Sequence, residues 1–494
     1  MPDVGELPVH QDEALGGLVA ARPLPELVST VLWDRGGAPL HFVLAHVGLA
    51  FDPSPQALRW VSVALALGTV PLTFDLGRRL AGPTGGVTAA AVLAASTMLG
   101  VYGTFGRMYA LFAFVTALAA DLFVRAVDLR TTKAALVAAF AAVLLPAAHP
   151  YGLLVLAAEA VVALVVWRGR PLRPGLVVAA VGLLVLPFAI ASLRLADRYG
   201  ADLGADRAVV SPREAARYLE HALRSFAGGR GWLFFLFLAL GMAGLILLAR
   251  TRPAFVAFTG LAVAAPLVLL LVVGTEEGAG QIYTRHMIFA LPLWSAAIGA
   301  AVAAATSRFG RVAQAAAVAA VAVLAILAPA GGASDPRTAV SGRLDRLAAP
   351  AAWIAEEAGE DDVLFPYSPV YLAALPTAED AVVVTRAQAD LVLRGLDDAD
   401  YPVGAAFVAL PLDNVELSEA GVETPPGVSA QIFPSWLLLR AEGPFADRRA
   451  VLVGLADALT AAADSSDDRF RMAGQGLASV CNALASLGGS CPER

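Results

Sequence analysis

The sequence predicts a mainly α-helical protein that crosses a membrane several times and carries a small soluble α/β domain at its C-terminal end. Of the 494 residues, 58% are hydrophobic and only 16% are charged, and the mean hydropathy is +0.69. Soluble globular domains are roughly 45–50% apolar and about 25% charged. The charge also shifts along the chain, because eleven Arg but twenty-four Asp or Glu residues lie from Asp335 onward. This split argues against a nucleic-acid-binding protein and favours a membrane-embedded part followed by an acidic soluble domain.

Ten apolar segments have about the length that a transmembrane helix needs. A bilayer core of about 30 Å is crossed by about 20 helical residues. We therefore expect a helical bundle over residues 57–330, preceded by an external loop over residues 1–56 and followed by the soluble domain over residues 335–494. The ten segments are residues 57–76, 84–103, 108–127, 133–148, 152–167, 175–194, 231–249, 254–273, 286–305 and 312–329.

Basic residues in alternate connections predict the orientation. Short cytoplasmic loops carry an excess of Lys and Arg, and every second connection here is short and basic. The other connections and the C-terminal domain then lie outside, which predicts a multi-pass protein of the plasma (inner) membrane with an extracytoplasmic C-terminal domain. The basic connections hold Arg78 and Arg79; Arg125, Arg130 and Lys133; Arg168, Arg170 and Arg173; Arg250 and Arg252; and Arg308 and Arg311.

The same alternation places the N-terminal arm outside. No signal peptide or first helix precedes Asp12, so we expect either a further helix ahead of Met1 or an arm that crosses by an unusual route, and favour the first. Residues 23–33 and 38–51 are apolar runs of about a dozen residues, too short to span. They suit two helices that lie in the headgroup plane.

The C-terminal region alternates strand-like and helical runs. The strand-like runs DVLFPY, AVVVT, AAFVALP, SAQIFP and WLLLRAE, with the helical stretches AAWIAEEAG and RRAVLVGLADALTAAA, predict a small α/β domain. It has no Walker loop, dinucleotide glycine pattern or CxxC motif, and its expected role is acceptor recognition or a lid. Cys481 and Cys491 either form a disulfide, if this end faces an oxidising compartment, or are two small buried residues.

Seven short motifs follow one another in a characteristic order. With this order and topological placement, residues 10–330 resemble the GT-C glycosyltransferases, most closely the bacterial protein-mannosyltransferase-like and aminoarabinose-transferase-like branch. The motifs are QDEAL (11–15), GAPLHFVLAH (37–46), ALRWVS (57–62), LGRRLAG (76–82), YGTFGRMYAL (102–111), HPYGLL (149–154) and YTRHMIFALP (283–292).

The resemblance implies transfer of a sugar from a polyprenyl-phosphate-linked donor to an acceptor on the outer face, with inversion. The acceptor stays open: a protein, a glycan or a lipid. An acid in the first external loop is the base in such enzymes, which implies this role for Asp12, with Glu13 beside it. A carboxylate can deprotonate an acceptor hydroxyl in line with the anomeric carbon. The alternative is a solvated acidic pair at the start of a helix.

Two arginines and two histidines are the expected partners of the lipid phosphate. Arg107 and Arg285 lie at predicted outer helix ends, and a guanidinium fork matches phosphate oxygens. His149 and His286 are expected to donate to the same phosphate or to hold a divalent metal. The alternatives are that the arginines are interfacial anchors with snorkelling stems and that His149 caps a tight turn before Pro150.

Tyr109, Tyr151 and Tyr283 are the expected substrate-binding aromatics, although aromatic residues of a membrane belt would give the same pattern. The chain also departs from the family. Relatives commonly have an acid where this chain has Phe105, which weakens the metal hypothesis, and GAPL at residues 37–40 replaces the usual His-Pro-Pro-Leu turn.

These departures leave room for a non-catalytic polyprenyl-lipid-binding or envelope scaffold protein. A transporter of lipid-linked sugars is a further alternative, because Glu159 interrupts an apolar run, where an ionisable group is costly and therefore functional by default. A protonated Glu159 bonded to a neighbouring helix is the simpler interpretation. No convincing internal repeat of the kind found in transporters occurs.

Overall fold

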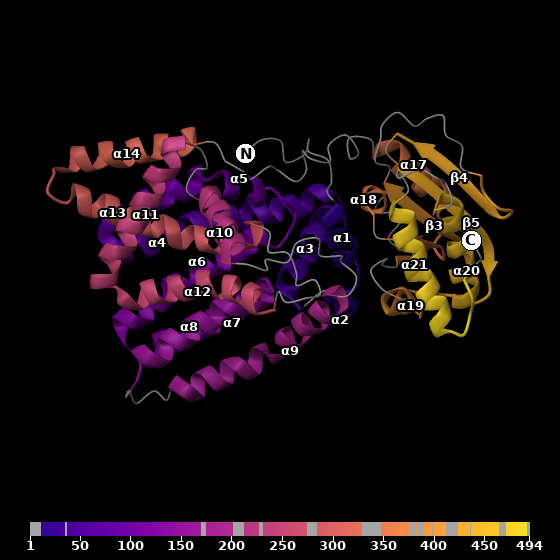
Figure 1. Cartoon of the computed structure of the whole chain (residues 1–494), viewed down its shortest axis with the longest axis horizontal. Coiled ribbons are helices and arrows are strands. Elements are labelled where there is room, and N and C mark those ends of the chain that lie inside the picture. The colour runs from indigo at the N-terminus through magenta and orange to yellow at the C-terminus, as the bar shows by residue number, and fades with distance from the viewer. Residues whose placement is uncertain are drawn as a thin grey trace. The chain divides into compact units, whose positions relative to one another are not determined.

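The computed structural model describes residues 11–34, 37–168, 174–200, 212–226, 231–273, 284–328, 347–366, 368–374, 382–383, 389–397, 399–411, 423–434, 436–463 and 471–491. The chain forms two compact units. Residues 28–44 and 59–334 form the first unit, and residues 2–27, 45–58 and 335–494 form the second. The helices of the first unit and the sheet of the second are drawn in Figure 1.

The first unit is a bundle of apolar helices. Among the residues that the structure describes, five helices are long and apolar enough to cross a membrane: Gln56–Ala94, Tyr109–Leu129, Gly175–Arg194, Gly231–Thr251 and Arg285–Thr306. Further apolar helices of 10–17 residues accompany them, so all ten predicted segments lie on helices, while the number that spans a bilayer stays a prediction. The elements are α2 (Leu24–Asp34), α3 (Pro39–Phe51), α4 (Pro55–Ala95), α5 (Thr97–Gly103), α6 (Tyr109–Leu129), α7 (Thr132–Ala148), α8 (Gly152–Val166), α9 (Pro174–Gly200), α10 (Pro212–Phe226), α11 (Gly231–Thr251), α12 (Pro253–Val273), the 3₁₀ helix η1 (Thr284–Phe289), α13 (Ala290–Thr306) and α14 (Arg311–Leu327).

α4 contains a sharp kink between the first two predicted segments. Ala81 and Gly82 have non-helical backbone angles, and Gly82 has φ +78°, a conformation that glycine adopts without steric cost. Pro83 follows and has no N–H to continue the hydrogen-bond ladder. The two segments are therefore separate helical halves, as the sequence predicts.

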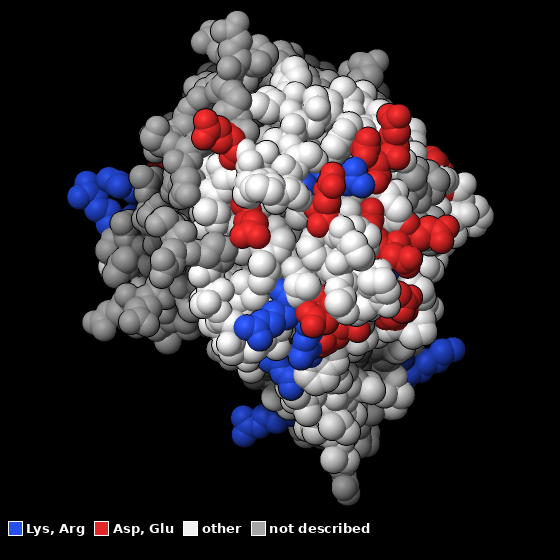
Figure 2. Space-filling model, turned by 90° about the vertical axis from the view of Figure 1, so that its right-hand side faces the viewer, with Lys and Arg blue, Asp and Glu red and all other residues white. Residues whose placement is uncertain are grey.

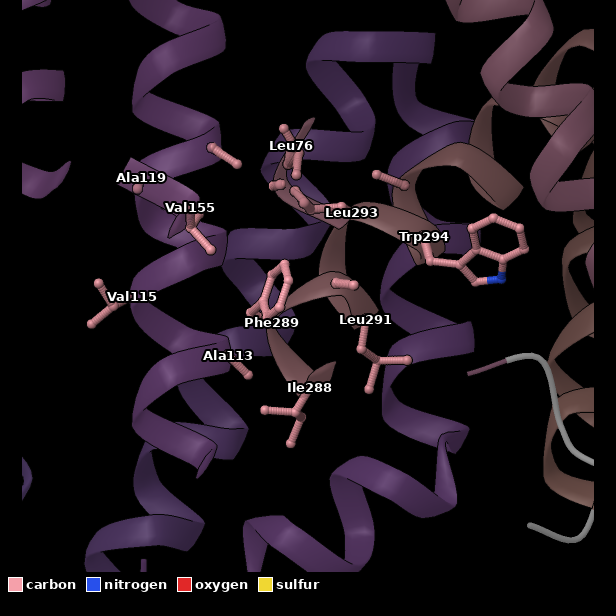
Figure 3. Packing of buried hydrophobic residues seen from close by; sticks show 14 of the residues in the cluster. Leu76, Ala113, Val115, Ala119, Val155, Ile288, Phe289, Leu291, Leu293 and Trp294 are labelled. Carbon is pink, nitrogen blue, oxygen red and sulfur yellow. The ribbon is translucent and has the colours of Figure 1, made fainter. Parts of the chain in front are cut away.

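α6 and α13 form the centre of the bundle. Figure 3 shows side chains of η1 and α13, among them Ile288, Phe289 and Leu293, lying among the helices around them. Small residues bring α11 and α13 close, because a Cβ on Gly244 would lie 1.8 Å from the Ala297 carbonyl oxygen. In a membrane the hydrophobic effect does not drive helices together, so they usually pack through small residues that let their backbones approach closely.

Ion pairs join three helices at the end of the bundle that carries the predicted cytoplasmic connections. The Nε of Arg79, on α4, lies 2.8 Å from a carboxylate oxygen of Asp121 on α6. Arg252, between α11 and α12, pairs with Asp128 and donates from Nη2 to the Arg79 carbonyl at 3.0 Å. These contacts fix the register of the three helices.

The second unit is a five-stranded mixed sheet covered by helices on both faces. Its strand order is β2-β1-β3-β5-β4, with β1 parallel to β2 and β3, and β5 antiparallel to β3 and β4. Each of the five strand-like runs named from the sequence contains described residues of one strand, and both helical stretches overlap a helix. The elements are α1 (Gln11–Ala20), α17 (Ala348–Glu357), β1 (Val363–Phe365), α18 (Pro369–Ala373), β2 (Val382–Val383), α19 (Ala389–Asp397), β3 (Val403–Pro411), β4 (Val428–Phe433), β5 (Trp436–Phe445), α20 (Arg448–Ala463) and α21 (Arg471–Ser486).

The sequence of β3 is continuously apolar because both faces of this strand are buried. Ala406 and Val408 face the cluster that includes α20 and α21, whereas Ala405 and Phe407 face the cluster that includes α1, α17 and α18. Successive side chains of a strand point to opposite faces, so a strand buried on both faces is apolar throughout. Acidic side chains are spread over the face of this unit shown in Figure 2. Cys481 and Cys491 form a disulfide, with Cα atoms 5.2 Å apart.

Candidate functional site

Three loops or helix ends of the first unit bring aromatic and histidine side chains into one cluster. Tyr109 begins α6, His149 and Tyr151 lie in the turn between α7 and α8, and His286 lies in η1. Ring centroids are 5.3 Å apart for His149 and His286, 5.1 Å for Tyr151 and His286, and 6.1 Å for Tyr109 and His286. Four residues predicted as site residues from distant parts of the sequence therefore lie together.

The turn after α7 holds His149 in one orientation. His149 caps α7 in an extended conformation, which the residue before a proline favours, and its N–H donates to the Leu145 carbonyl at 3.1 Å. The backbone N–H of Tyr151 donates to the His149 Nδ1 at 3.1 Å, and the ring stacks on Phe112 with centroids 4.6 Å apart. Because Nδ1 is an acceptor, the proton of the neutral ring lies on Nε2. Nε2–H is thus available as a donor.

Two arginines border this cluster. The Arg285 guanidinium carbon lies 5.7 Å from the centre of the Tyr109 ring. Burial, then the positive charges of Arg107 and Arg285, lower the pKa of His149 from 6.5 to about 3. The histidine is therefore neutral near pH 7, while the two guanidinium groups carry the positive charge beside it.

The start of α4 supports the loop that carries Arg107. The Ser62 hydroxyl donates to the Arg107 carbonyl at 3.4 Å, and the Arg107 N–H donates to the Phe105 carbonyl at 2.6 Å. Arg59 lies one turn earlier on α4 and is only 2% exposed. A buried arginine at a helix end in a membrane protein indicates a functional or structural ion site.

His41 is a further member of this site. Its side chain is 1% exposed, and its Nε2 has no hydrogen-bond partner among the described residues. Burial, then the charge of Arg107, lower the pKa of His41 to about 3, so it too is neutral near pH 7. His41 lies in the GAPLHFVLAH motif and Arg59 in the ALRWVS motif, but neither is among the site residues predicted from the sequence. The available signals were a histidine within an apolar run and an arginine near the start of the predicted span over residues 57–76.

Phe105 is part of the aromatic packing around Tyr109. Phe105 is fully buried and stacks on Tyr109 with centroids 6.0 Å apart, and Tyr102 lies 5.2 Å from the same Tyr109 ring. Within the described ranges, no group of three His, Cys, Asp or Glu residues is arranged to hold a metal ion. His149 and His286 alone do not make a divalent-metal site, which usually takes three or four ligands.

The acidic pair lies in the second unit. Asp12 and Glu13 occupy the first turn of α1, where Asp12 is half-buried and Glu13 is 2% exposed. Carboxylates in a first turn also interact favourably with the helix dipole, so this geometry fits both the catalytic and the structural interpretation. Tyr283 lies outside the described residues. Glu159, in the middle of α8, lines a cavity between α7, α8 and α9.

Comparisons with known proteins find the same fold in solved structures. No model of a known protein family and no curated protein matches the sequence. A crystal structure of ArnT from Cupriavidus metallidurans bound to undecaprenyl phosphate matches with a TM-score of 0.58 and 14% identity, over 90% of this chain and 96% of that chain. The apo structure of the same enzyme matches with a TM-score of 0.53 and 13% identity, over 89% and 95%. At 13–14% identity these matches show that this chain shares the fold of ArnT.

Proposed function

We propose that this protein is a membrane glycosyltransferase that transfers a sugar from a polyprenyl-phosphate donor to an extracytoplasmic acceptor. The observation that carries the proposal is the cluster of the His149, His286 and Tyr109 rings with the Arg285 guanidinium carbon 5.7 Å from the Tyr109 ring centre, in a fold shared with an ArnT that binds undecaprenyl phosphate. Two guanidinium groups beside buried aromatic rings suit a lipid phosphate, because they supply charge and directed donors in a site of low dielectric.

Neutral donors complete the proposed phosphate site. The Nε2–H of His149 would donate to a phosphate oxygen, and His286, 5.3 Å away between ring centroids, would provide a second imidazole. Tyr109 and Tyr151 would contact the sugar, and we extend this role to Tyr283. Aromatic faces suit the apolar C–H surface of a sugar ring, while their hydroxyls bond to its polar edge.

Asp12 is the proposed base, with Glu13 beside it. Its carboxylate would take the proton of the acceptor hydroxyl while that oxygen forms a bond to the anomeric carbon. The bond between this carbon and the phosphate oxygen would break with inversion, and the electron pair would leave on the polyprenyl phosphate. Arg107 and Arg285 would stabilise the charge that develops there.

The acceptor, a protein, glycan or lipid of the cell envelope, would lie on the outer face of the inner membrane. The Cys481–Cys491 disulfide favours an oxidising compartment for the C-terminal unit. We propose that this unit recognises the acceptor or covers the site. Mannosyl transfer is the sugar specificity that we would test first.

A non-catalytic protein that binds a polyprenyl lipid is the second candidate. The packing of Phe105 on Tyr109 favours it, because that position lacks the acid that relatives use. Such a protein would keep the arginine site and bind the lipid phosphate, but would break no glycosidic bond.

The decisive experiment separates lipid binding from sugar transfer. Purified protein in nanodiscs would receive a panel of radiolabelled hexosyl and pentosyl polyprenyl phosphates, and both bound lipid and consumed donor would be measured. We expect Asp12→Asn to bind donor as the wild type does but to lose transfer at least about 10²-fold. Arg107→Gln should weaken binding itself, whereas Arg250→Gln, an exposed arginine in the last turn of α11, should change neither.

Two results would redirect the proposal. Undiminished transfer by Asp12→Asn would remove this residue from the chemistry. A wild type that binds polyprenyl phosphate but consumes no donor of the panel, with or without added envelope acceptors, would support the non-catalytic candidate.

A further inference from the structure

A cavity of about 280 Å³ lies between α7, α8 and α9, apart from the His149 cluster. These three helices run side by side in Figure 1. Small residues on all three helices create the space, where larger side chains would fill it. Its walls include Ala138 and Ala142 on α7, Ala157 and Ala160 on α8, Gly182 on α9, and Trp167 after α8.

Glu159 is the one carboxyl group among the described residues that line the cavity. It is 5% exposed, and its Oε2 has no hydrogen-bond partner among the described residues. An unsatisfied buried oxygen costs free energy, and an ionisable residue inside a membrane segment is expensive. We therefore expect a bound molecule to supply the missing hydrogen bond to the Glu159 carboxyl, and the cavity is the space from which such a molecule can reach it.

The size and shape of the space suit a small part of a lipid. Small residues normally let membrane helices pack closely, but here they leave a volume just below the roughly 300–1,000 Å³ of typical ligand sites. An apolar cavity of about 150 Å³ already binds a molecule as large as benzene. The Glu159 cavity can therefore hold a short length of hydrocarbon chain with one polar group.

The opening of the cavity indicates that its occupant comes from the bilayer. Ala157 and Gly182 are exposed lining residues, and their neighbours Val161 and Leu183 are 52% and 71% exposed. These apolar residues lie on helices whose outer faces contact lipid chains in a membrane. A water-soluble ligand would have to cross that surface, whereas a lipid chain enters from it directly.

The charges of the lining residues argue against lipid headgroups that carry a phosphate or an ammonium group. None of the described residues that line the cavity is Lys, Arg or His, so a phosphate would meet no cation and would face a carboxyl. An ammonium group would have to lose its hydration in an apolar space, a cost that pairing with one carboxyl often fails to offset. A neutral hydroxyl donates to or accepts from a carboxyl without that cost.

We propose that the Glu159 cavity binds a neutral membrane lipid with a free hydroxyl, such as a long-chain alcohol or a diacylglycerol, with the chain against the alanine walls and the hydroxyl on Glu159. This site is independent of the proposed transferase function, because it uses none of the residues assigned to the lipid phosphate or the acceptor.

A photoreactive, alkyne-tagged long-chain alcohol tests the proposal on the full-length protein in nanodiscs. After illumination, labelled peptides are identified by mass spectrometry, and unlabelled hexadecanol is added as competitor. We expect saturable labelling of α7, α8 and α9 peptides. Hexadecanol should compete at least about tenfold better than hexadecane, because only the alcohol reaches Glu159 with a hydrogen bond.

Matched variants connect the labelling to the cavity. A Cβ on Gly182 would meet no atom within 4 Å, so Gly182→Leu should fill the space without a clash. Gly175 lies on the same helix, has equally open surroundings and does not line the cavity, which makes Gly175→Leu the control. Labelling should fall at least about tenfold in Gly182→Leu and in Glu159→Leu, and stay within about twofold in Gly175→Leu and Glu159→Gln.

Three outcomes would overturn the proposal. Labelling that does not saturate, or that is equally strong on the exposed helix α14, would mean general contact with lipid. Unchanged labelling in Gly182→Leu, shown to be folded by its melting temperature, would place the probe elsewhere. If a long-chain ammonium competes better than the alcohol, the ligand of Glu159 is a cation and not a hydroxyl group.

Discussion

Replacing His149 with Gln should make the protein less sensitive to acid. In the folded protein, burial and two nearby arginines lower the pKa of this imidazole from 6.5 to about 3. In the unfolded chain it returns to about 6.5. Between these values the unfolded state binds a proton that the folded state does not, so stability falls as the pH decreases from 6.5 toward 3 and is unaffected by this group above 6.5.

The loss of folding stability can be worked out from the distance between the pH and the pKa of the unfolded chain. At pH 4.5 the imidazole is two pH units below its unfolded pKa, and each unit corresponds to about 1.36 kcal/mol, which gives about 2.7 kcal/mol of lost stability. Gln keeps an acceptor for the Tyr151 N–H and a donor group but does not titrate. The pKa of His41 is lowered to the same value, so the double variant with His41→Gln should lose about twice as much of the acid sensitivity.

The assay is thermal unfolding in one detergent at pH 7.5, 6.5, 5.5 and 4.5. The wild type should lose several degrees more than His149→Gln between pH 6.5 and 4.5, and the two should run parallel between pH 7.5 and 6.5. Parallel curves over the whole range would mean that His149 is solvated or binds a proton in the folded state. The neutral-donor role proposed for it would then be wrong.

Three further predictions concern the phosphate site and the packing of the bundle. Arg285→Lys keeps a charge but loses the planar fork, so polyprenyl-phosphate affinity should fall about tenfold in an equilibrium binding assay; equal affinity would mean that a point charge suffices. Gly244→Ala places a Cβ against a carbonyl of α13 and should cost about 1–3 kcal/mol in thermal unfolding, whereas Gly260→Ala, with nothing within 4 Å, should cost almost nothing. Asp121→Asn leaves Arg79 without one of its two carboxylates and should cost about 3 kcal/mol, and replacing both residues, Asp121 by Leu and Arg79 by Met, should restore part of that loss; a double variant no more stable than Asp121→Asn would contradict this account.

Local pattern predicts much of this architecture. The run AAFVALP becomes β3, and RRAVLVGLADALTAAA becomes α20, because apolar periodicity and turn residues act within a few positions of each other. Residues that begin or end helices, such as Tyr109 and His149, could be assigned to one side of the membrane from the basic connections alone. However, knowing that two residues lie on the same side of the membrane does not show that their rings are in contact.

Contacts between residues far apart in the sequence could not be predicted from local patterns. The charge of Arg107 lowers the pKa of His41 although the two residues are 66 positions apart in the sequence, and nothing in the GAPLHF stretch indicates which helix α3 will contact. Arg59 lies near the start of a predicted span, and no local pattern indicates that Ser62, one turn further on, donates to the carbonyl of Arg107. α1, from the other end of the chain, packs in the cluster that covers one face of the C-terminal sheet, an arrangement that no local pattern indicates.

Phe105 shows how these long-range contacts bear on mechanism. With an acid at this position, a negative charge would lie in contact with Tyr109, next to the arginines, and would need a cation of its own. With Phe, the ring stacks on Tyr109 and adds no charge. A leaving phosphate carries a charge of about −1.5 to −2 near pH 7, and Arg107 and Arg285 together supply two positive charges, while His41 and His149 are neutral there. The described side chains can therefore balance the charge of a polyprenyl phosphate by themselves, which is why the proposed mechanism assigns the departure of the lipid phosphate to the arginines.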